Sequence, residues 1–304
     1  MIPISQESVL AFDVGGSHVS AAVCFEDGFR LGPEISEEYP AEQSTEAFVD
    51  LVIRLGDRAR AGMEGVGGAV LAFPGPFDFD AGISRMQHKL PYLFGKDLRG
   101  LLAGRFQWRG EQVRFLHDAG AFLLGEVGAG AARRAARAAV ITLGTGIGSA
   151  FAIDGHLVFE GAGVPPGGEI WNLPFEGGIV EDSVSSRAIR KSYERLTGKQ
   201  REVAALAAVA ATDASAREAF AAFGRHLGLA LRRNLAEFAP AVVVLGGGIA
   251  RSAPLFMDAA AREVEGLGLE LRVSELMGHA PLVGAGVAWF NGDKVASSRG
   301  NPGQ

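Results

Sequence analysis

The stretch Phe115–Glu126, F-L-H-D-A-G-A-F-L-L-G-E, places one acid, Asp118, between an apolar run and a series of small and apolar residues. The apolar run predicts a strand that ends near Leu116, and the residues after Asp118 predict a helix. In an open α/β sheet, an acid at the carboxyl end of a strand faces the crevice where ligands bind. The alternative is that Asp118 only caps the helix by accepting an N–H bond of its first turn.

A glycine-rich hairpin is predicted near the start of the chain. Two apolar runs, Val9–Val14 and Val19–Phe25, are joined by Gly15-Gly16-Ser17. Asp27-Gly28, a pair typical of type I′ turns, then leads toward a third strand. Because glycine has no side chain, several backbone N–H groups in such a loop can approach one anion. Gly15, Gly16 and Ser17 are therefore candidate phosphate-binding residues.

The same pattern returns downstream of Asp118. A predicted strand, Ala139–Leu143, is followed by a glycine loop at 144–148, a second strand, Ser149–Ile153, and another turn, Asp154-Gly155. The candidate phosphate-binding residues of this loop are Gly144, Thr145, Gly146 and Gly148. Two such halves would clamp an extended phosphorylated ligand, although Asp-Gly turns are common enough for the repeat to be coincidental. A dinucleotide-binding fold is not expected, because that fold has a helix where Ser149–Ile153 predicts a strand.

Three further positions are candidates for ligand binding. Asp13 ends the first strand beside Gly15 and has the chemistry to hold Mg²⁺ through water. Gly246, Gly247 and Gly248 follow an apolar run and precede a predicted helix, so they form either an adenosine or phosphate site or a tight turn. Pro74-Gly75-Pro76 ends another apolar run in a rigid loop.

The composition is that of a globular protein, with 48% apolar and 21% charged residues among 304. This length suits two domains or one large one. A net charge of −6 disfavours a nucleic acid or an anionic membrane as partner. A single cysteine, Cys24, excludes an intrachain disulfide and a thiolate zinc site. The sequence has neither a basic and apolar leader nor an apolar run of about 18 residues, so we expect a cytoplasmic protein.

Five motifs occur in the order known from one family of sugar kinases. They are D-V-G-G-S at Asp13–Ser17, P-G-P at Pro74–Pro76, H-D-A-G-A-F-L-L-G-E at His117–Glu126, L-G-T-G-I-G at Leu143–Gly148 and L-G-G-G-I at Leu245–Ile249. Together they resemble the ROK family (repressors, open reading frames and kinases) within the actin/hexokinase-like superfamily. The resemblance runs from about Val9 to Phe290, which is nearly the whole chain.

The resemblance implies an α/β fold of the two-domain actin-like ATPase (ribonuclease H-like) type with an interdomain cleft. We expect an N-terminal domain at 1–117 and a C-terminal domain at 118–304, whose polar last residues, 291–304, are expected to fray. The implied activity is ATP-dependent phosphorylation of a hexose or N-acetylhexosamine, at the 6-hydroxyl, with Mg²⁺ and with Asp118 as general base. The implied sugar-binding residues are Pro74, Gly75, His117, Asp118, Glu169, Asn172 and Glu181. A homodimer is also expected.

The chain departs from the family pattern around the sugar. Where the family usually has E-x-G-H, the sequence reads Glu169-Ile170-Trp171-Asn172, and the usual cysteine motif is replaced by F-E-G-G-I-V-E at Phe175–Glu181. We therefore predict no structural zinc, because the histidine and cysteine ligands are both missing. Several alternatives stay open. Glu169 and Glu181 are either sugar acceptors or solvated acids, and Trp171 either stacks on the sugar or packs beneath the loop. His117, where the family has Asn, is either a polar contact or packing histidine or a second base.

Two rival functions follow from the same residues. Because the sugar motifs are altered, the chain is alternatively a sugar-binding or sensing protein with little or no kinase activity. A DNA-binding regulator is disfavoured, because the first hairpin begins within about ten residues of the start and the net charge is acidic. ATP and polyphosphate are both considered as phosphate donors. The arginines at positions 133, 134 and 137 are either solvent-facing or suited to polyphosphate.

Overall fold

The computed structural model describes residues 7–40, 42–63 and 65–292, and it divides into two compact units. Unit 1 spans residues 1–130 and 279–304, and unit 2 spans residues 131–278. This division differs from the boundary expected after His117, because the segment that follows His117 and the last helix both belong to unit 1. Of the expected frayed tail at 291–304, residues 293–304 lie outside the described residues.

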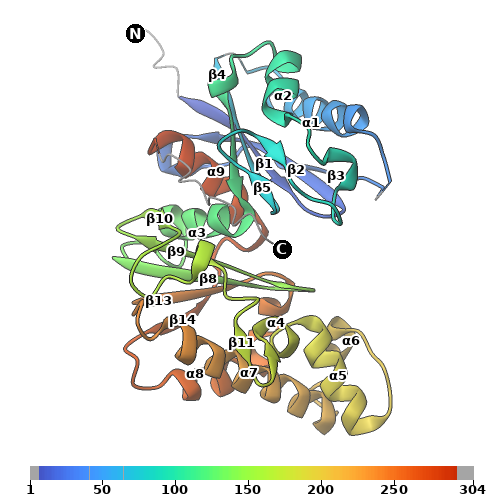
Figure 1. The fold of residues 1–304 in the computed structure, drawn as a ribbon, viewed down its shortest axis with the longest axis vertical. Coiled ribbons are helices and arrows are strands. Elements are labelled where there is room, and N and C mark those ends of the chain that lie inside the picture. The colour runs from blue at the N-terminus through green and yellow to red at the C-terminus, as the bar shows by residue number, and fades with distance from the viewer. Residues whose placement is uncertain (1–6, 41, 64, 293–304) are drawn as a thin grey trace. The chain divides into compact units, whose positions relative to one another are not determined.

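Unit 1 is built on a five-stranded mixed sheet of order β3-β2-β1-β4-β7 (Figure 1). The strands are β1 (Ser8–Val14), β2 (His18–Phe25), β3 (Ile35–Glu38), β4 (Val66–Phe73) and β7 (Val113–His117). The first three form an antiparallel meander, and β4 and β7 continue the sheet parallel to β1. The predicted glycine hairpin is therefore the β1–β2 pair.

Unit 2 repeats this topology in a five-stranded sheet of order β10-β9-β8-β13-β14. Its strands are β8 (Arg137–Leu143), β9 (Ile147–Ile153), β10 (His156–Val158), β13 (Val242–Gly246) and β14 (Glu270–Val273). Again three strands form an antiparallel meander, and the last two run parallel to the first. The α/β fold and the internal repeat predicted from the two glycine hairpins are thus confirmed.

The two Asp-Gly turns differ in length. Asp154-Gly155 is a two-residue turn between the paired residues Ile153 and His156, and both turn residues have positive φ, as type I′ requires. Asp27-Gly28 instead begins a 3-10 turn, η1 (Asp27–Phe29), and the N–H of Phe25 bonds the carbonyl of Arg30. The prediction of a two-residue turn at Asp27-Gly28 is therefore wrong, because the following Phe29 also adopts a positive φ and lengthens the loop.

Helices cover both faces of the unit 1 sheet (Figure 1). α1 (Thr45–Ala59) and α2 (Leu98–Phe106) bury Phe48, Leu55 and Phe106 in one core with Leu10 and Phe12 of β1. α3 (Asp118–Ala129) and α9 (Ala280–Phe290) pair with each other, and α9 contacts β1, β2 and β4.

Glycines let α3 and α9 approach very closely. A Cβ added to Gly284 of α9 would collide with the carbonyl oxygen of Ala121, and one added to Gly125 of α3 would collide with that of Ala280. Gly286 similarly leaves room for the side chain of Cys24 on β2. The α3–α9 pair is therefore held at a backbone separation that only glycine permits at these positions.

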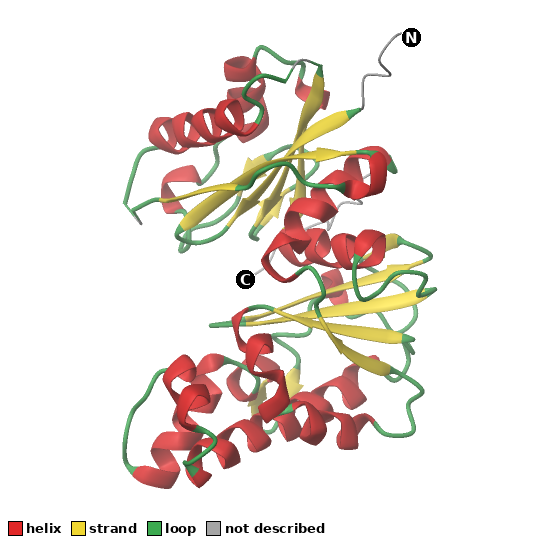
Figure 2. Cartoon of the chain, turned by 180° about the vertical axis from the view of Figure 1, so that it is seen from behind, coloured by secondary structure: helices red, strands yellow, loops and turns green. Residues whose placement is uncertain are grey.

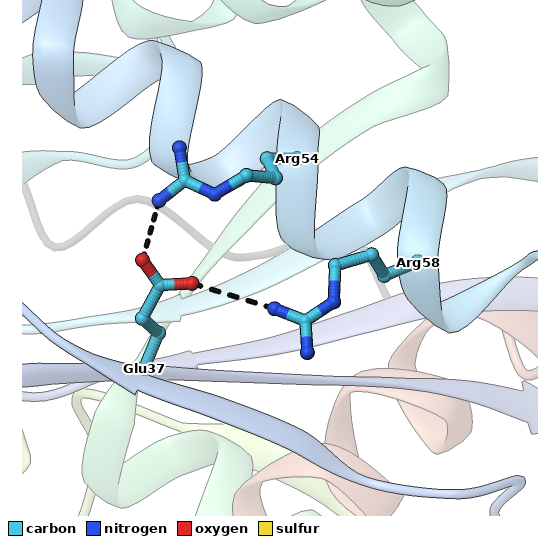
Figure 3. A network of polar contacts seen from close by, with 3 residues as sticks. All are labelled: Glu37, Arg54 and Arg58. Carbon is cyan, nitrogen blue, oxygen red and sulfur yellow. Dashed lines mark hydrogen bonds and ion pairs between the residues drawn. The ribbon is translucent and has the colours of Figure 1, made fainter.

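Charged side chains connect α1 to the edge strand β3 (Figure 3). The Glu37 carboxylate of β3 accepts from Arg54 through one oxygen and from Arg58 through the other, with 3.4 Å between Arg58 Nη1 and Oε2. Both arginines are exposed, so these pairs contribute at most about 1 kcal/mol each. They also place charge along a sheet edge, which discourages pairing with another strand.

The helices of unit 2 gather on one side of its sheet (Figure 2). They are α4 (Val180–Ser183), α5 (Ser186–Thr197), α6 (Val203–Val209), α7 (Ala214–Leu235) and α8 (Met257–Val264). As its spacing predicts, α7 buries one stripe containing Phe220, Phe223, Leu227, Leu231 and Leu235. The predicted helix after Gly246–Gly248 is instead the 3-10 segment η5 (Gly248–Leu255), which contains Pro254.

Short elements complete the chain. The two small hairpins are β5 (Phe77–Asp78) with β6 (Ile83–Ser84), and β11 (Pro174–Phe175) with β12 (Gly178–Ile179). The remaining 3-10 turns are η2 (Pro91–Leu93), η3 (Gly110–Gln112), η4 (Pro166–Gly168) and η6 (Met277–His279). Across the described ranges, none of the helices combines the length and apolarity that crossing a bilayer would require.

Alanine substitution should affect stability in opposite directions at a glycine of the α3–α9 contact and at an exposed helical glycine elsewhere. Gly284→Ala should destabilise the protein by about 1–3 kcal/mol, because its methyl group has no room against Ala121. Gly104→Ala in α2 is the matched control, since a Cβ there meets no atom within 4 Å. It should stabilise the protein by about 0.5–1 kcal/mol through its helix propensity. Urea denaturation of both variants measures the difference, and equal effects would contradict this account of the helix pair.

Candidate functional site

Unit 1 brings its predicted site residues to one edge of the sheet. In the parallel strands, Asp13 pairs with Ala72, and Phe73 pairs with His117. The carboxyl ends of β1, β4 and β7 therefore lie side by side, and each is followed by a predicted motif. These are the first glycine loop, the Pro74–Pro76 loop and Asp118.

Asp118 is the first residue of α3 and not its N-cap. The N-cap position is occupied by His117, whose side chain makes no capping bond. Asp118 Oδ1 accepts the N–H of the adjacent Ala119 at 2.7 Å. The Asp118 side chain remains 46% exposed, so part of its carboxylate is available to a ligand. Asp118 thus accepts one N–H of the first helical turn, as the capping alternative expects, and its partly exposed side chain also suits a base that must reach a substrate.

His117 both packs against a ring and reaches Asp118. Its imidazole meets Phe79 edge to face, with the ring centroids 5.9 Å apart, and its side chain is 22% exposed. His117 Nε2 lies 3.4 Å from Asp118 Oδ1. His117 therefore both packs against the protein and makes a polar contact, because packing fixes the ring that contacts the acid.

Asp13 lies among negative charges at this edge. Burial raises its pKa to about 7, and the carboxylates of Asp118 and Glu34 add to the shift. A divalent cation at this position would offset that repulsion, and Mg²⁺ prefers sites with few carboxylates that also offer phosphate and water ligands. The donor set around Asp13 therefore fits the expected Mg²⁺.

The first glycine loop is held by its own backbone and by Tyr39. The Gly15 N–H donates to the His18 carbonyl at 2.9 Å, so this N–H is used within the turn. The Tyr39 hydroxyl donates to the Gly15 carbonyl, and the Tyr39 N–H donates to the Ser17 carbonyl at 2.9 Å. A Cβ at Gly16 would meet no protein atom within 4 Å, which leaves this side of the loop open to a ligand.

The second glycine loop is held by a carboxylate. Its Gly144 N–H donates to the Gly146 carbonyl at 3.0 Å, and its Ile147 N–H donates to Glu181 Oε2 at 3.1 Å. A Cβ at Gly146 would lie 2.7 Å from that same oxygen, so a side chain there would displace Glu181. None of the glycines in this loop has positive φ. Gly146 is thus needed for the close approach of Glu181 and not for backbone conformation.

The third glycine segment combines a tight turn with an open position. Gly247 has φ +82°, and a Cβ there would collide with the backbone of Leu143. A Cβ at Gly248 would meet nothing within 4 Å. The tight-turn alternative therefore holds for Gly247, whereas Gly248 offers space for an adenosine or a phosphate.

Trp171 holds Glu169 in the loop expected to bind sugar. The indole Nε1–H donates to Glu169 Oε2 at 2.8 Å, while the Trp171 side chain stays at the surface with the residue 37% exposed. Trp171 therefore does not pack beneath the loop, and Glu169 is not a purely solvated acid. Asn172 follows as an exposed residue.

Glu181 is tied to both the glycine loop and the Trp171 loop. Besides the bond from Ile147, its own N–H donates to the Trp171 carbonyl at 3.0 Å. The alternative of a solvated loop acid is thus wrong for Glu181. Its Oε2 is engaged by the protein backbone, so a bound sugar would share this carboxylate with Ile147.

Two residues that hold these loops were not identified from the sequence. Tyr39 follows the short strand β3 and fixes the first glycine loop. Ser149 on β9 is buried, and its hydroxyl donates to the Gly168 carbonyl at 2.7 Å and accepts the Ile170 N–H at 3.0 Å. Neither belongs to a motif, and their bonds join segments whose pairing no sequence pattern indicates.

Two of the three arginines before the second glycine loop already have partners in the protein. Arg137 lies over the Phe238 ring at 4.3 Å, and its Nε–H donates to the Phe238 carbonyl at 2.7 Å. Arg133 lies 4.0 Å from Glu275. The structural use of Arg137 weakens the case for a polyphosphate site at this cluster.

Comparison with known proteins identifies the family. A model of the ROK family matches residues 9–287. The chain belongs to the ROK family. This ROK-family chain is 27% identical to a glucokinase of Thermotoga maritima, over 80% of this chain and 83% of that protein.

Solved structures of ROK proteins share the fold. The structure is similar to the ROK hexokinase of Thermus thermophilus with a TM-score of 0.78 and 26% identity, over 93% of this chain and 98% of the hexokinase. A ROK-family glucokinase of Streptomyces griseus, solved with glucose and AMPPNP, matches with a TM-score of 0.75 and 21% identity, over 91% and 97% of the two chains. The expected two-domain actin-like kinase fold is therefore confirmed.

The raised pKa of Asp13 predicts how stability depends on pH. The folded protein binds this proton more tightly than the unfolded chain does, so stability should fall as the pH rises from about 4 to about 7. Each pKa unit corresponds to about 1.4 kcal/mol. Without Mg²⁺, Asp13→Asn should thus raise the melting temperature at pH 8 and change it little at pH 4. Adding Mg²⁺ should stabilise the wild type more than the variant, and equal shifts in both would contradict the assignment of the cation to Asp13.

Proposed function

We propose that this chain transfers the γ-phosphoryl group of ATP to a sugar hydroxyl, the 6-hydroxyl of a hexose or N-acetylhexosamine. The observation that carries the proposal is the position of Asp118, which follows a strand end directly, stays half exposed and lies beside Asp13 at the same sheet edge. Membership of the ROK family and similarity to glucokinases support it.

In this proposal Asp118 accepts the proton of the attacking hydroxyl. Its Oδ1 is held by the N–H of Ala119 and lies near His117, which fixes the carboxylate beside the reacting oxygen. Glu169, Asn172 and Glu181, with Pro74, Gly75 and His117, are assigned to the sugar. Carboxylates suit this role, because each accepts several hydroxyl bonds without requiring a charged substrate.

The nucleotide is assigned to the glycine loops. Gly15 and Gly144 donate their N–H groups within the loops, so we assign phosphate contacts to the remaining N–H groups of Gly16–Ser17 and Thr145–Gly148. Gly248, beside the open space, is assigned to adenosine with Gly246 and Gly247. Mg²⁺ at Asp13 would supply positive charge to the phosphates, which is the main form of stabilisation in phosphoryl transfer.

A coupled ADP-release assay tests the proposed activity. Glucose, N-acetylglucosamine, N-acetylmannosamine, mannose, fructose and allose are compared with a sugar-free blank. In a parallel series polyphosphate replaces ATP, and the sugar phosphate itself is measured, because transfer from polyphosphate releases no ADP. We expect one of these sugars to raise ADP release well above the blank. Sugar binding without any ADP release would favour the alternative of a sugar-binding or sensing protein.

Asp118→Asn should separate catalysis from binding. The amide keeps the shape and the bond from Ala119 but cannot accept a proton, so kcat should fall about 10²–10⁴-fold. The dissociation constant of the sugar, measured by calorimetry, should change little. A variant with near wild-type turnover would remove Asp118 from its assigned role.

The absence of a structural zinc remains a prediction. In the part of the chain that the structure describes, no three His, Cys, Asp or Glu side chains gather in a group suited to a metal ion. The hydrogen bonds of Trp171 and Ser149 hold the loop that zinc would otherwise stabilise. Elemental analysis of dialysed protein should find well below one zinc per chain, and a stoichiometric amount would contradict this prediction.

A further inference from the structure

Hydrogen bonds connect the second glycine loop and the predicted sugar loop in a closed ring within unit 2. From β9, the Ile147 N–H bonds Glu181, and the Glu181 N–H bonds the Trp171 carbonyl. The Trp171 indole then bonds Glu169. Ser149, which lies on β9 two positions after Ile147, closes the ring. Its hydroxyl bonds the Gly168 carbonyl and the Ile170 N–H, which lie on either side of Glu169.

We propose that this ring makes Glu181 the residue through which sugar binding raises the affinity of the second glycine loop for nucleotide. The inference rests on the proposed sugar kinase function and assigns Glu181 a second role beside sugar binding. Trp171 acts as a positioning residue in the ring, because it holds Glu169 by its side chain and Glu181 by its backbone.

The sign of the coupling follows from charge. Glu181 Oε2 occupies the space next to Gly146 and accepts the Ile147 N–H, in a loop whose N–H groups are assigned to phosphate. Without sugar, this carboxylate repels an incoming phosphate and competes for the same donor. Sugar hydroxyls that donate to Glu181 delocalise its charge and hold it in place. Sugar should therefore tighten nucleotide binding, and by linkage nucleotide should tighten sugar binding equally.

Three variants separate charge from structure. Glu181→Gln keeps the size and an acceptor for Ile147 but removes the charge. Trp171→Phe keeps an aromatic ring but removes the donor to Glu169. Glu176→Gln is the matched control, because Glu176 is an exposed glutamate at the tip of the β11–β12 hairpin, which directly precedes the helix that carries Glu181.

Calorimetry with Mg²⁺ and AMPPNP, alone and with saturating D-glucose, measures the coupling. Glucose should tighten nucleotide binding about 5–100-fold in the wild type and in Glu176→Gln. Glu181→Gln should bind the nucleotide several-fold more tightly without glucose and should show less than about two-fold coupling. A merely structural glutamate would give the opposite result, namely weaker nucleotide binding with the coupling intact. That result, or a wild type without coupling, would overturn the proposal.

Hydrogen exchange without any ligand keeps this test separate from the kinase activity. Trp171→Phe should raise deuterium uptake both in peptides covering residues 168–173 and in peptides covering 144–150, although only the first set contains the substitution. An increase confined to residues 168–173 would show that the ring does not act as a unit and would overturn the proposal. Because no sugar or nucleotide is present, that failure would be independent of whether the chain phosphorylates a sugar.

Discussion

The close packing of α3 against α9 is the constraint on which the position of Asp118 depends. Asp118 begins α3, and that helix is held against α9 at a separation that Gly125 and Gly284 allow. Because α9 also lies on β1, β2 and β4, the helix that carries Asp118 is fixed to the same sheet that carries Asp13. The last helix therefore belongs with unit 1, although about half of the chain separates the two helices in sequence.

The two units share one topology but hold their glycine loops by different chemistry. In unit 1 a neutral hydroxyl, that of Tyr39, binds a loop carbonyl and adds no charge to the turn. In unit 2 a carboxylate, that of Glu181, binds a loop N–H and places negative charge beside the residues assigned to phosphate. The duplication thus reproduces the scaffold, whereas the side chains that hold each loop, those of Tyr39 and Glu181, lie outside the repeated strands.

The sequence predicted the strands, the repeat and the placement of the motifs at strand ends, because these depend on apolar periodicity and on glycine spacing. It did not predict which N–H groups the loops use internally, as at Gly15 and Gly144, because that depends on exact turn geometry. It also missed the 3-10 conformation after Gly247 and the bonds of Tyr39 and Ser149. Those bonds join segments distant in sequence, and a single polar residue in a strand carries no signal of its partner.

The acidic edge of unit 1 links function to a cost in stability. Burial, with smaller contributions from the carboxylates of Asp118 and Glu34, raises the pKa of Asp13 to about 7. Like charges so placed oppose folding, and a sequence shaped for stability alone would replace one of them with a neutral residue. Hydrogen bonding does not require them either, since asparagine would accept the Ala119 N–H that Asp118 accepts. The carboxylates of Asp118 and Asp13 suit a base and a cation site at this edge, respectively, whereas amides would supply neither.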